Sequence, residues 1–276
     1  MEASGIVTLI TDFGLTDPYV GQLKGELLKR WQGARIIDIT HAIHPHDIQG
    51  AAMTLFTCYH HFPAGTVHLI VVDPGVGSHR KILAARSNDY FFIAPDNGVF
   101  SPFLERELLY DIRKIDGGGV ASSATFHGRD IMAPLAADLA QGKTFIAAGE
   151  AIEPSDCVCL PSLKVQRTDD HLIGQVIRID HFGNIRLSIR YTDLQGWAVP
   201  PENILVQLGG EHIGPLLRTY SDCTPDRLCV VIDSDGFLEV AVNRGNAAQK
   251  LRSKVHDTVV VLPRSAVLYP SNGMES

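Results

Sequence analysis

Four short polar segments in the first half of the chain carry residues that could bind a ligand or transfer a proton. They are residues 11–14 (Thr-Asp-Phe-Gly), 73–80 (Asp-Pro-Gly-Val-Gly-Ser-His-Arg), 95–98 (Pro-Asp-Asn-Gly) and 126–130 (Phe-His-Gly-Arg-Asp). The first three follow strand-like runs, and the fourth precedes a helical pattern. Ligands bind beyond the carboxyl ends of the strands of an open α/β sheet. A lone Asp there is usually a turn or cap residue, but four such segments at one edge favour a shared site.

The glycines in these segments do not indicate a phosphate site. Gly75-Val76-Gly77 lacks the third glycine of a dinucleotide fingerprint, and no Walker lysine follows it. The carboxylates instead favour a ligand that carries hydroxyl groups and a positive charge. We therefore expect a small-molecule substrate and no nucleotide cofactor.

Two groups of residues have the composition of metal ligands but a more ordinary interpretation. His41, His44 and His46 lie within six residues, which is compatible with a metal site but more often marks a polar surface loop. Cys157 and Cys159 could form half of a zinc site, yet no second close pair accompanies them. We predict that the protein has no metal site.

The second half of the chain offers polar residues of a different kind. Residues 180–184 (Asp-His-Phe-Gly-Asn) interrupt two strand patterns, and a simple turn is an equally good interpretation of them. Residues 234–236 (Ser-Asp-Gly) have the composition of a hairpin turn. Glu239 lies inside the next strand pattern, where a carboxylate is unfavourable unless it meets a partner or a ligand. Residues 243–247 (Asn-Arg-Gly-Asn-Ala) open a short helix.

The elements that must position these residues follow from the hydrophobic pattern. In the first half, short apolar runs alternate with helical patterns, which predicts an α/β domain with a mostly parallel sheet covered by helices, over residues 1–160. Asp17 is expected to cap a helix whose first residue is Pro18. Asp47 is expected to cap the next helix.

From residue 171 onward, strand-like runs recur at short spacing with few helices. The spacing predicts a smaller, antiparallel, barrel-like β domain over residues 171–263 and a loosely held tail over residues 264–276. The predicted strands are residues 172–179, 184–189, 204–208, 228–232, 237–242 and 258–262.

Charge and composition exclude several classes of protein. The net charge is −7, from 24 basic and 31 acidic residues, and no basic run is present, so we expect neither a nucleic-acid nor an anionic-membrane partner. No apolar window approaches a bilayer span, and the start lacks the basic region of a signal peptide. The five cysteines, an odd and sparse set, predict free thiols and a cytoplasmic location.

Five motifs in order carry a family resemblance. Residues 11–14, 72–77, 95–98, 126–130 and 182–184, together with a match that runs from residue 6 to residue 248, resemble the S-adenosylmethionine (SAM) hydroxide adenosyltransferases. This family comprises adenosine-forming SAM hydrolases related to the SAM-dependent fluorinase and chlorinase. The resemblance implies attack of water or hydroxide on the ribose C5′ of SAM, which releases adenosine and L-methionine. SAM is then the substrate, and no cofactor is required.

The resemblance also implies the site residues and the assembly. Asp73, Arg80 and His127 correspond to the catalytic set, with His127 as a candidate acceptor of the water proton and Arg80 stabilising the developing hydroxide. The expected substrate-binding residues are Asp12 at the ribose hydroxyls, Asn184, Ser234 and Glu239 on other parts of the ligand, Ala247 near the adenine, and Asp180 and Phe182, with Phe182 facing the sulfonium. The family is typically a homotrimer whose sites lie between subunits.

Three alternatives remain open at this point. A SAM-dependent halogenase is disfavoured because Asp73 would repel an incoming halide, and because residues 94–126 carry no obvious insertion. A metal-dependent hydrolase built on His41, His44 and His46 is a second alternative. A non-catalytic adenosine or SAM sensor is the third, although binding alone does not require the catalytic set.

Overall fold

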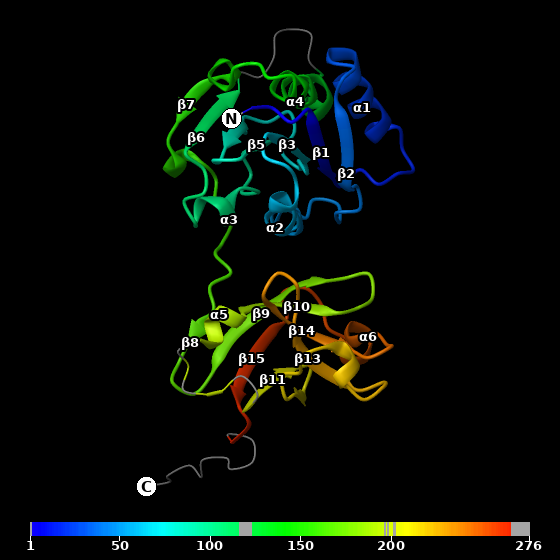
Figure 1. Cartoon of the computed structure of the whole chain (residues 1–276), viewed down its shortest axis with the longest axis vertical. Coiled ribbons are helices and arrows are strands. Elements are labelled where there is room, and N and C mark those ends of the chain that lie inside the picture. Colours follow the sequence, from blue (N-terminus) through cyan, green and yellow to red (C-terminus); the bar gives the residue numbers. More distant parts are fainter. Residues whose placement is uncertain (1, 116–122, 196, 198, 201–202, 266–276) are drawn as a thin grey trace. The chain divides into compact units, whose positions relative to one another are not determined.

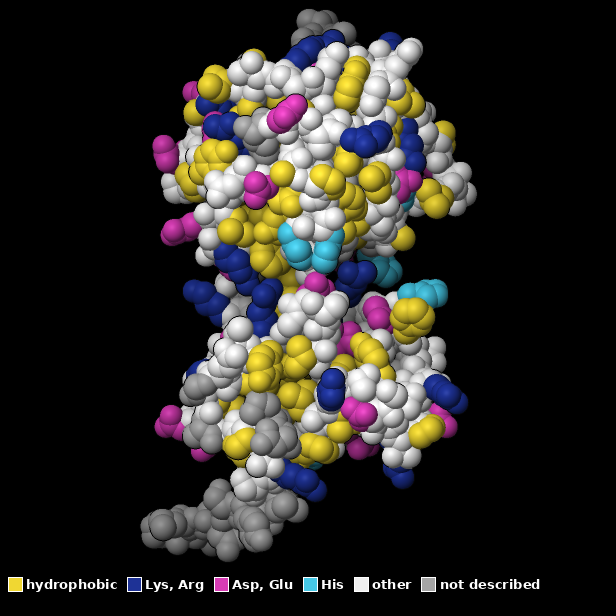
Figure 2. All heavy atoms as spheres, viewed as in Figure 1, with side chains coloured by type: hydrophobic (Ala, Val, Ile, Leu, Met, Phe, Trp, Pro, Cys, Tyr) yellow, Lys and Arg dark blue, Asp and Glu magenta, His cyan; other side chains and the backbone are white. Residues whose placement is uncertain are grey.

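The computed structural model describes residues 2–115, 123–195, 197, 199–200 and 203–265. The chain divides into two compact units, Met1–Pro161 and Ser162–Ser276. Each unit has a hydrophobic core of its own. Acidic and basic side chains are both present on the viewed face of each unit (Figure 2). None of the helices in the described part of the chain is long and apolar enough to cross a bilayer.

The N-terminal unit is built on a mixed sheet with strand order β2-β1-β3-β5-β4-β6-β7. The pairs β1–β2, β1–β3 and β3–β5 are parallel, and β4, β6 and β7 add antiparallel pairs at one side. The α/β class predicted from the sequence is confirmed. The elements are β1 (Ile6–Thr11), α1 (Tyr19–Arg30), β2 (Arg35–Thr40), α2 (Ile48–Cys58), β3 (Thr66–Val71), β4 (Ile82–Arg86), β5 (Tyr90–Pro95), α3 (Ser101–Leu104), β6 (Asp111–Ile115), α4 (Ala133–Ala140) and β7 (Glu150–Ile152).

Helices cover both faces of this sheet (Figure 1). Alternate residues of a strand point to opposite faces, so β1 sends Val7 and Leu9 to one core and Ile10 to the other. The first core includes Leu23 and Leu27 of α1 and the alanine-rich face of α4, and the second includes Ala51 and Leu55 of α2. Both faces of the central strands are therefore buried, as expected for parallel strands.

The topology brings three of the polar segments to one edge of the sheet. Strands β1, β3 and β5 are parallel neighbours, with Thr11 paired to Val71 and Leu69 to Ile93. Residues 11–14, 73–80 and 95–98 therefore leave the sheet at the carboxyl ends of adjacent strands. This is the edge where open α/β sheets bind ligands.

The ends of the helices correct one prediction and confirm another. Helix α1 begins at Tyr19, and Pro18 occupies the cap position with no side-chain cap, so the predicted cap by Asp17 is wrong. Pro18 has a ψ of 2°, outside the helical range, which delays the helix by one residue. Asp47 caps α2 as predicted, because its carboxylate accepts the N–H of Gly50 at 2.8 Å.

The C-terminal unit is an antiparallel sheet with strand order β12-β11-β15-β9-β10-β14-β13, and β8 pairs with β9. The two ends of this order, β12 and β13, also contact each other, so the sheet nearly closes on itself. The barrel-like prediction is confirmed. Of the predicted tail, residues 266–276 lie outside the described residues. The elements are β8 (Gln166–Arg167), β9 (Leu172–Ile179), β10 (Ile185–Arg190), α5 (Tyr191–Leu194), β11 (Ile204–Leu208), β12 (Glu211–Ile213), β13 (Leu228–Ile232), β14 (Phe237–Val242), α6 (Ala247–Leu251) and β15 (Thr258–Pro263).

Candidate active site

Arg80 joins Asp73 and His127 in one hydrogen-bonded cluster. Its Nε donates to Asp73 Oδ1 at 2.7 Å, and its Nη2 donates to Asp73 Oδ2 and, at 3.1 Å, to His127 Nδ1. The side chains of Arg80 and Asp73 are only 9% and 6% exposed. A bidentate guanidinium–carboxylate pair of this kind is both strong and geometrically specific. The structure thus brings together the three residues that the family resemblance implies as a catalytic set.

The loop between β3 and β4 sets the position of Asp73 and Arg80. Within it, the N–H of Val76 donates to the carbonyl of Asp73, and the N–H of Ser78 donates to the carbonyl of Gly75. Gly77 has a φ of 79°, and a Cβ there would lie 2.5 Å from the carbonyl oxygen of Ala124. Glycine therefore lets this loop approach the segment that carries His127.

The contact with Arg80 determines which nitrogen of His127 carries a proton. A guanidinium has only donors, so His127 Nδ1 must be the acceptor in this hydrogen bond. A neutral imidazole whose Nδ1 accepts carries its proton on Nε2. The cluster therefore presents an Nε2–H donor from His127 next to a buried carboxylate and a fixed positive charge.

Asp12 lies at the end of the neighbouring strand β1. Its Oδ2 accepts the N–H of His46 at 3.0 Å, which ties the loop after β1 to the loop after β2. The end of β1 is also joined to the loop after β2 by a hydrogen bond between Thr11 Oγ1 and His41 Nδ1 at 2.9 Å. Asp12 is thus held at the edge of the sheet next to the segment that carries Asp73.

These contacts give the histidines of residues 41–46 separate environments. His41 is buried against Thr11, whereas His44 and His46 are exposed. Among the residues that the structure describes, no group of three or more His, Cys, Asp or Glu side chains is arranged to hold a metal ion. Cys157, Cys159, Cys223 and Cys229 are thiols outside any disulfide.

In the C-terminal unit, residues 180–184 form a tight turn organised by Asp180. Asp180 Oδ1 accepts the N–H groups of Phe182 at 2.9 Å and Asn184 at 2.8 Å, and Oδ2 accepts from Asn184 Nδ2 at 3.2 Å. These hydrogen bonds are those of a simple turn, which is one of the two interpretations that the sequence left open. The turn leaves Phe182 72% exposed.

A close backbone approach brings this turn to the start of helix α6. Gly183 has a φ of 84°, and a Cβ there would lie 2.1 Å from the side chain of Asn246. The carbonyl of Gly183 accepts the N–H of Ala248, and Asn246 caps α6 through the N–H of Gln249. Asn184 and the buried Ala247 are therefore brought near each other.

Glu239 is a buried carboxylate whose partner the sequence did not reveal. It lies in β14 and is 5% exposed, and Tyr220 donates its hydroxyl to Glu239 Oε1 at 2.7 Å. Burial raises the pKa of Glu239, and the charges of Asp180 and Asp233 act in the same direction, against the bond from Tyr220 and the charge of Arg186. Tyr220 begins a short 3₁₀ turn, and nothing in its sequence context marks it as a contact of Glu239.

The hairpin that carries Ser234 is held by Arg186 of β10. Arg186 Nε lies 2.6 Å from Asp233 Oδ2, and its Nη2 donates to Asp235 Oδ2 at 2.6 Å. Ser234 itself is exposed between these two anchored residues. Arg186 therefore fixes the position of Ser234 by pairing with the aspartates on either side of it.

Comparison with known proteins agrees with this geometry. The SAM hydroxide adenosyltransferase N-terminal domain matches residues 7–149, and the C-terminal domain of the same family matches residues 174–260. The chain is 36% identical to a protein named (R)-S-adenosyl-L-methionine hydrolase from Salinispora arenicola, over 91% of this chain and 95% of the relative. It is 27% identical to a fluorinase from Actinoplanes sp., over 95% of this chain and 99% of that protein.

Among solved structures, the chain is similar to an uncharacterized conserved protein from Thermotoga maritima. The TM-score is 0.86 and the identity 34%, and the match covers 93% of this chain and 99% of that one. Two family domains in order, together with relatives that match over nearly their whole length, establish the family. The chain belongs to the SAM hydroxide adenosyltransferase family.

Proposed function

We propose that this protein hydrolyses SAM to adenosine and L-methionine. The observation that carries the proposal is the bridge that Arg80 makes between Asp73 and His127 at the ligand-binding edge of the sheet. The name of the 36%-identical relative supports the hydrolase, and the fluorinases are more distant at 27%. Because the relatives' name specifies the R configuration at sulfur, we propose that the R epimer of SAM is a substrate.

The reaction needs one nucleophile and no acid on the leaving group. The oxygen of a water molecule forms a bond to C5′, the C5′–S bond breaks, and its electron pair returns to sulfur. Methionine leaves as a neutral thioether. The attacking oxygen loses a proton to a carboxylate as the C–O bond forms, so it has partial hydroxide character in the transition state.

The contact between Arg80 and His127 favours a particular division of roles. The sequence alone suggests His127 as the base, but its Nδ1 lone pair is engaged by Arg80. We assign the Nε2–H of His127 to holding the water oxygen. The Asp73 carboxylate keeps lone pairs beyond the two it shares with Arg80, so we assign it to accepting the proton. Arg80 orients both groups and stabilises negative charge on the attacking oxygen.

The other predicted residues are assigned to the ligand. Asp12 binds the ribose hydroxyls, and Asn184, Ser234, Glu239 and Ala247 contact the rest of the substrate. Asp180 shapes the turn that presents Phe182. The exposed Phe182 ring is available for a cation–π contact with the sulfonium, which is worth about 0.5–2 kcal/mol.

The test of this function is incubation of the purified protein with SAM in water enriched in ¹⁸O. We expect adenosine and methionine in equal amounts, with the label in the 5′-hydroxyl of adenosine. Parallel reactions with added chloride or fluoride report on halogenation, because a 5′-halo-adenosine forms only in a halogenase. Binding of adenosine without loss of SAM over long incubation would replace the hydrolase with a sensor.

Replacing His127 with glutamine and with alanine tests the division of roles. Glutamine keeps an N–H donor but cannot accept a proton, so we expect His127→Gln to retain a kcat at least about tenfold above that of His127→Ala, in keeping with a hydrogen bond to a charged group. Steady-state kinetics on both variants measures the ratio. If His127 is the base, both variants lose activity equally, by roughly 10²–10⁴-fold.

We further propose that the protein is cytoplasmic and a homotrimer, with each site completed by the C-terminal unit of a neighbouring subunit. The resemblance to the family and the division of the expected ligand residues between the two units support this assembly. We expect light scattering to give three times the chain mass of 30.1 kDa. A stable monomer with full activity would exclude a shared site.

A further inference from the structure

The residues on either side of His127 are fixed by contacts outside the active-site cluster. His127 immediately precedes a π-helical turn, Gly128–Met132, that leads into α4. Such turns are rare and occur frequently at functional sites. The N–H groups of Arg129 and Asp130 both donate to the carbonyl of Phe126, at 3.1 Å each, so the backbone loops tightly around His127.

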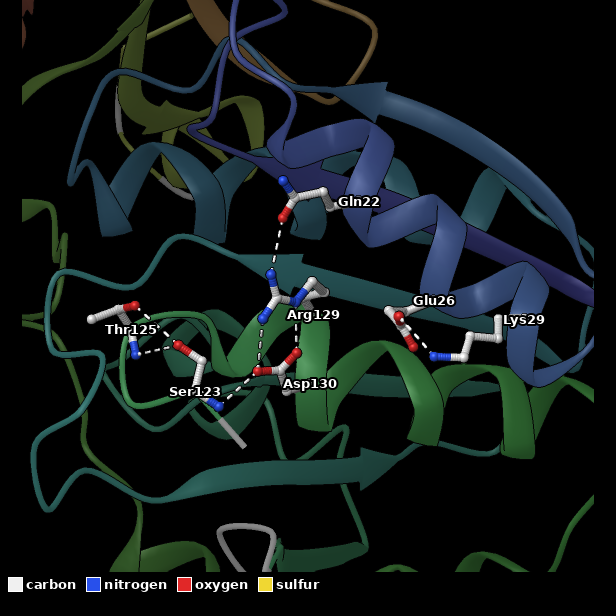
Figure 3. Close-up of polar contacts among 7 residues, drawn as sticks. All are labelled: Gln22, Glu26, Lys29, Ser123, Thr125, Arg129 and Asp130. Carbon is white, nitrogen blue, oxygen red and sulfur yellow. Dashed lines mark hydrogen bonds and ion pairs between the residues drawn. The ribbon is translucent and has the colours of Figure 1, made fainter. Parts of the chain in front are cut away.

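Arg129 and Asp130 form a bidentate ion pair that reaches two other segments (Figure 3). Arg129 Nε and Nη2 donate to the Asp130 carboxylate at 2.6 and 3.0 Å. Arg129 Nη1 donates to Gln22 Oε1 of α1 at 3.0 Å, and Asp130 Oδ2 accepts the N–H of Ser123 at 2.8 Å. The pair therefore ties the π-helical turn both to α1 and to the segment before His127.

Phe126, on the other side of His127, is held by the same guanidinium. Arg129 lies over the Phe126 ring at 4.9 Å from its centroid. The ring also packs edge-on against Phe13, at 5.6 Å, and Tyr19, at 5.7 Å. The backbone of His127 is thus held from both flanks by contacts other than the hydrogen bonds that join Asp73, Arg80 and His127.

The contacts of this pair favour positioning over a contribution to stability. The side chains of Arg129 and Asp130 are 30% and 17% exposed, and ion pairs near the surface add little to folding. Together with Gln22, Gly25 and Glu26 they line an open hollow of about 430 Å³, so one side of the pair faces solvent. The bond from Arg129 holds the pKa of Asp130 below its usual value, and the hydrogen bond from the N–H of Ser123 acts in the same direction.

We propose that Arg129 and Asp130 are positioning residues, which hold His127 at the distance from Arg80 that catalysis requires. This inference rests on the proposed function. A displacement of about 1 Å at a reacting group can cost about 100-fold in rate. Losing the pair is therefore expected to lower kcat while leaving substrate binding and folding nearly unchanged.

The test compares Arg129→Gln with a matched control, Arg30→Gln. Arg30 makes an equally bidentate pair with Asp138, at 2.6 and 2.7 Å, which joins α1 to α4 but touches neither flank of His127. We expect Arg129→Gln to lower kcat about 10–100-fold with KM changed less than about threefold, and Arg30→Gln to keep the wild-type kcat. Both variants should lose a similar, small amount of thermal stability.

Asp130 provides an independent arm should Arg129→Gln fold poorly. Asp130→Asn keeps an oxygen that can accept the N–H of Ser123, whereas Asp130→Ala does not. We expect the kcat of Asp130→Asn to be at least about threefold higher than that of Asp130→Ala, because a net hydrogen bond contributes ~1 kcal/mol. Equal kcat values in Asp130→Asn and Asp130→Ala would overturn the proposal.

A spectroscopic readout separates this inference from the proposed function. The ring ¹⁵N signals of His127, assigned by their loss in His127→Gln, should shift in Arg129→Gln and stay in place in Arg30→Gln. If the wild-type protein does not turn over SAM, the proposed function is wrong, but the ring ¹⁵N signals of His127 still test the positioning role. If Arg129→Gln has the same kcat and the same His127 signals as Arg30→Gln, the positioning role is wrong while the proposed function stands.

Discussion

Arg80→Ala is expected to lower the kcat for SAM hydrolysis by roughly 10³-fold. Removal of a single donor that stabilises developing negative charge costs about 10²–10³-fold, and this substitution also frees Asp73 and His127 from their common anchor. Adenosine binding should weaken far less, since the ligand contacts lie elsewhere. Steady-state kinetics and calorimetric titration with adenosine measure the two effects separately.

The same substitution should also destabilise the fold. It leaves the Asp73 carboxylate, 6% exposed, without its cation, and breaking a buried pair costs about 3–5 kcal/mol. The double variant Asp73→Asn/Arg80→Gln removes both charges together, so its stability should recover while its kcat stays low. Recovery of kcat along with stability would show that Arg80 acts on folding rather than on the reaction.

Acid should weaken the fold through His68, a residue remote from the cluster. His68 is fully buried in β3, bonded to Thr8 Oγ1 at 2.7 Å and stacked on Phe92, and burial lowers its pKa to about 3. Its pKa in the unfolded chain is about 6.5, so the unfolded state binds the additional proton. The contribution of neutral His68 is complete above pH 6.5 and is lost as the pH falls toward 3, by up to about 1.4 kcal/mol per pH unit.

Urea unfolding at pH 7.5, 5.5 and 4.5, at one protein concentration, measures this loss. His68→Asn keeps a polar atom near Thr8 but does not titrate, so its free energy of unfolding should fall less between pH 7.5 and 4.5. The expected difference between the two proteins over this range is about 2–3 kcal/mol. Parallel pH dependences in wild type and variant would assign the acid sensitivity to other groups.

The apolar strands were predictable because local pattern and tertiary role agree. The runs at β9, β11, β13 and β14 are rich in branched side chains, and each begins and ends at the predicted residue. Strand β6 was not predicted, because its sequence, Asp-Ile-Arg-Lys-Ile, places two isoleucines three residues apart without alternation. Pairing with β4 and β7 forms this strand, and Arg113 is satisfied by Asp111 and the carbonyl of Gly149.

The candidate site likewise has a part that could be predicted from the sequence and a part that could not. Strand order places residues 11–14 and 73–80 at one edge, and this part followed from the sequence. The contact between Arg80 and His127, which are 47 residues apart, depends on how two loops approach at Gly77. The partner of Glu239 could not be found, because Tyr220 reaches it from a 3₁₀ turn whose direction no local pattern specifies.

The π-helical turn after His127 has a consequence for how this protein can vary in length. A π turn holds one more residue than the α-helical turn that would span the same hydrogen bonds. Deleting one residue from Gly128–Met132 would restore regular winding and leave His127 and α4 in nearly the same relative orientation, whereas one deletion from a regular α-helix rotates its two ends by about 100° about the axis. In this stretch, the loss of one residue therefore disturbs the placement of His127 less than it would in an ordinary helical turn.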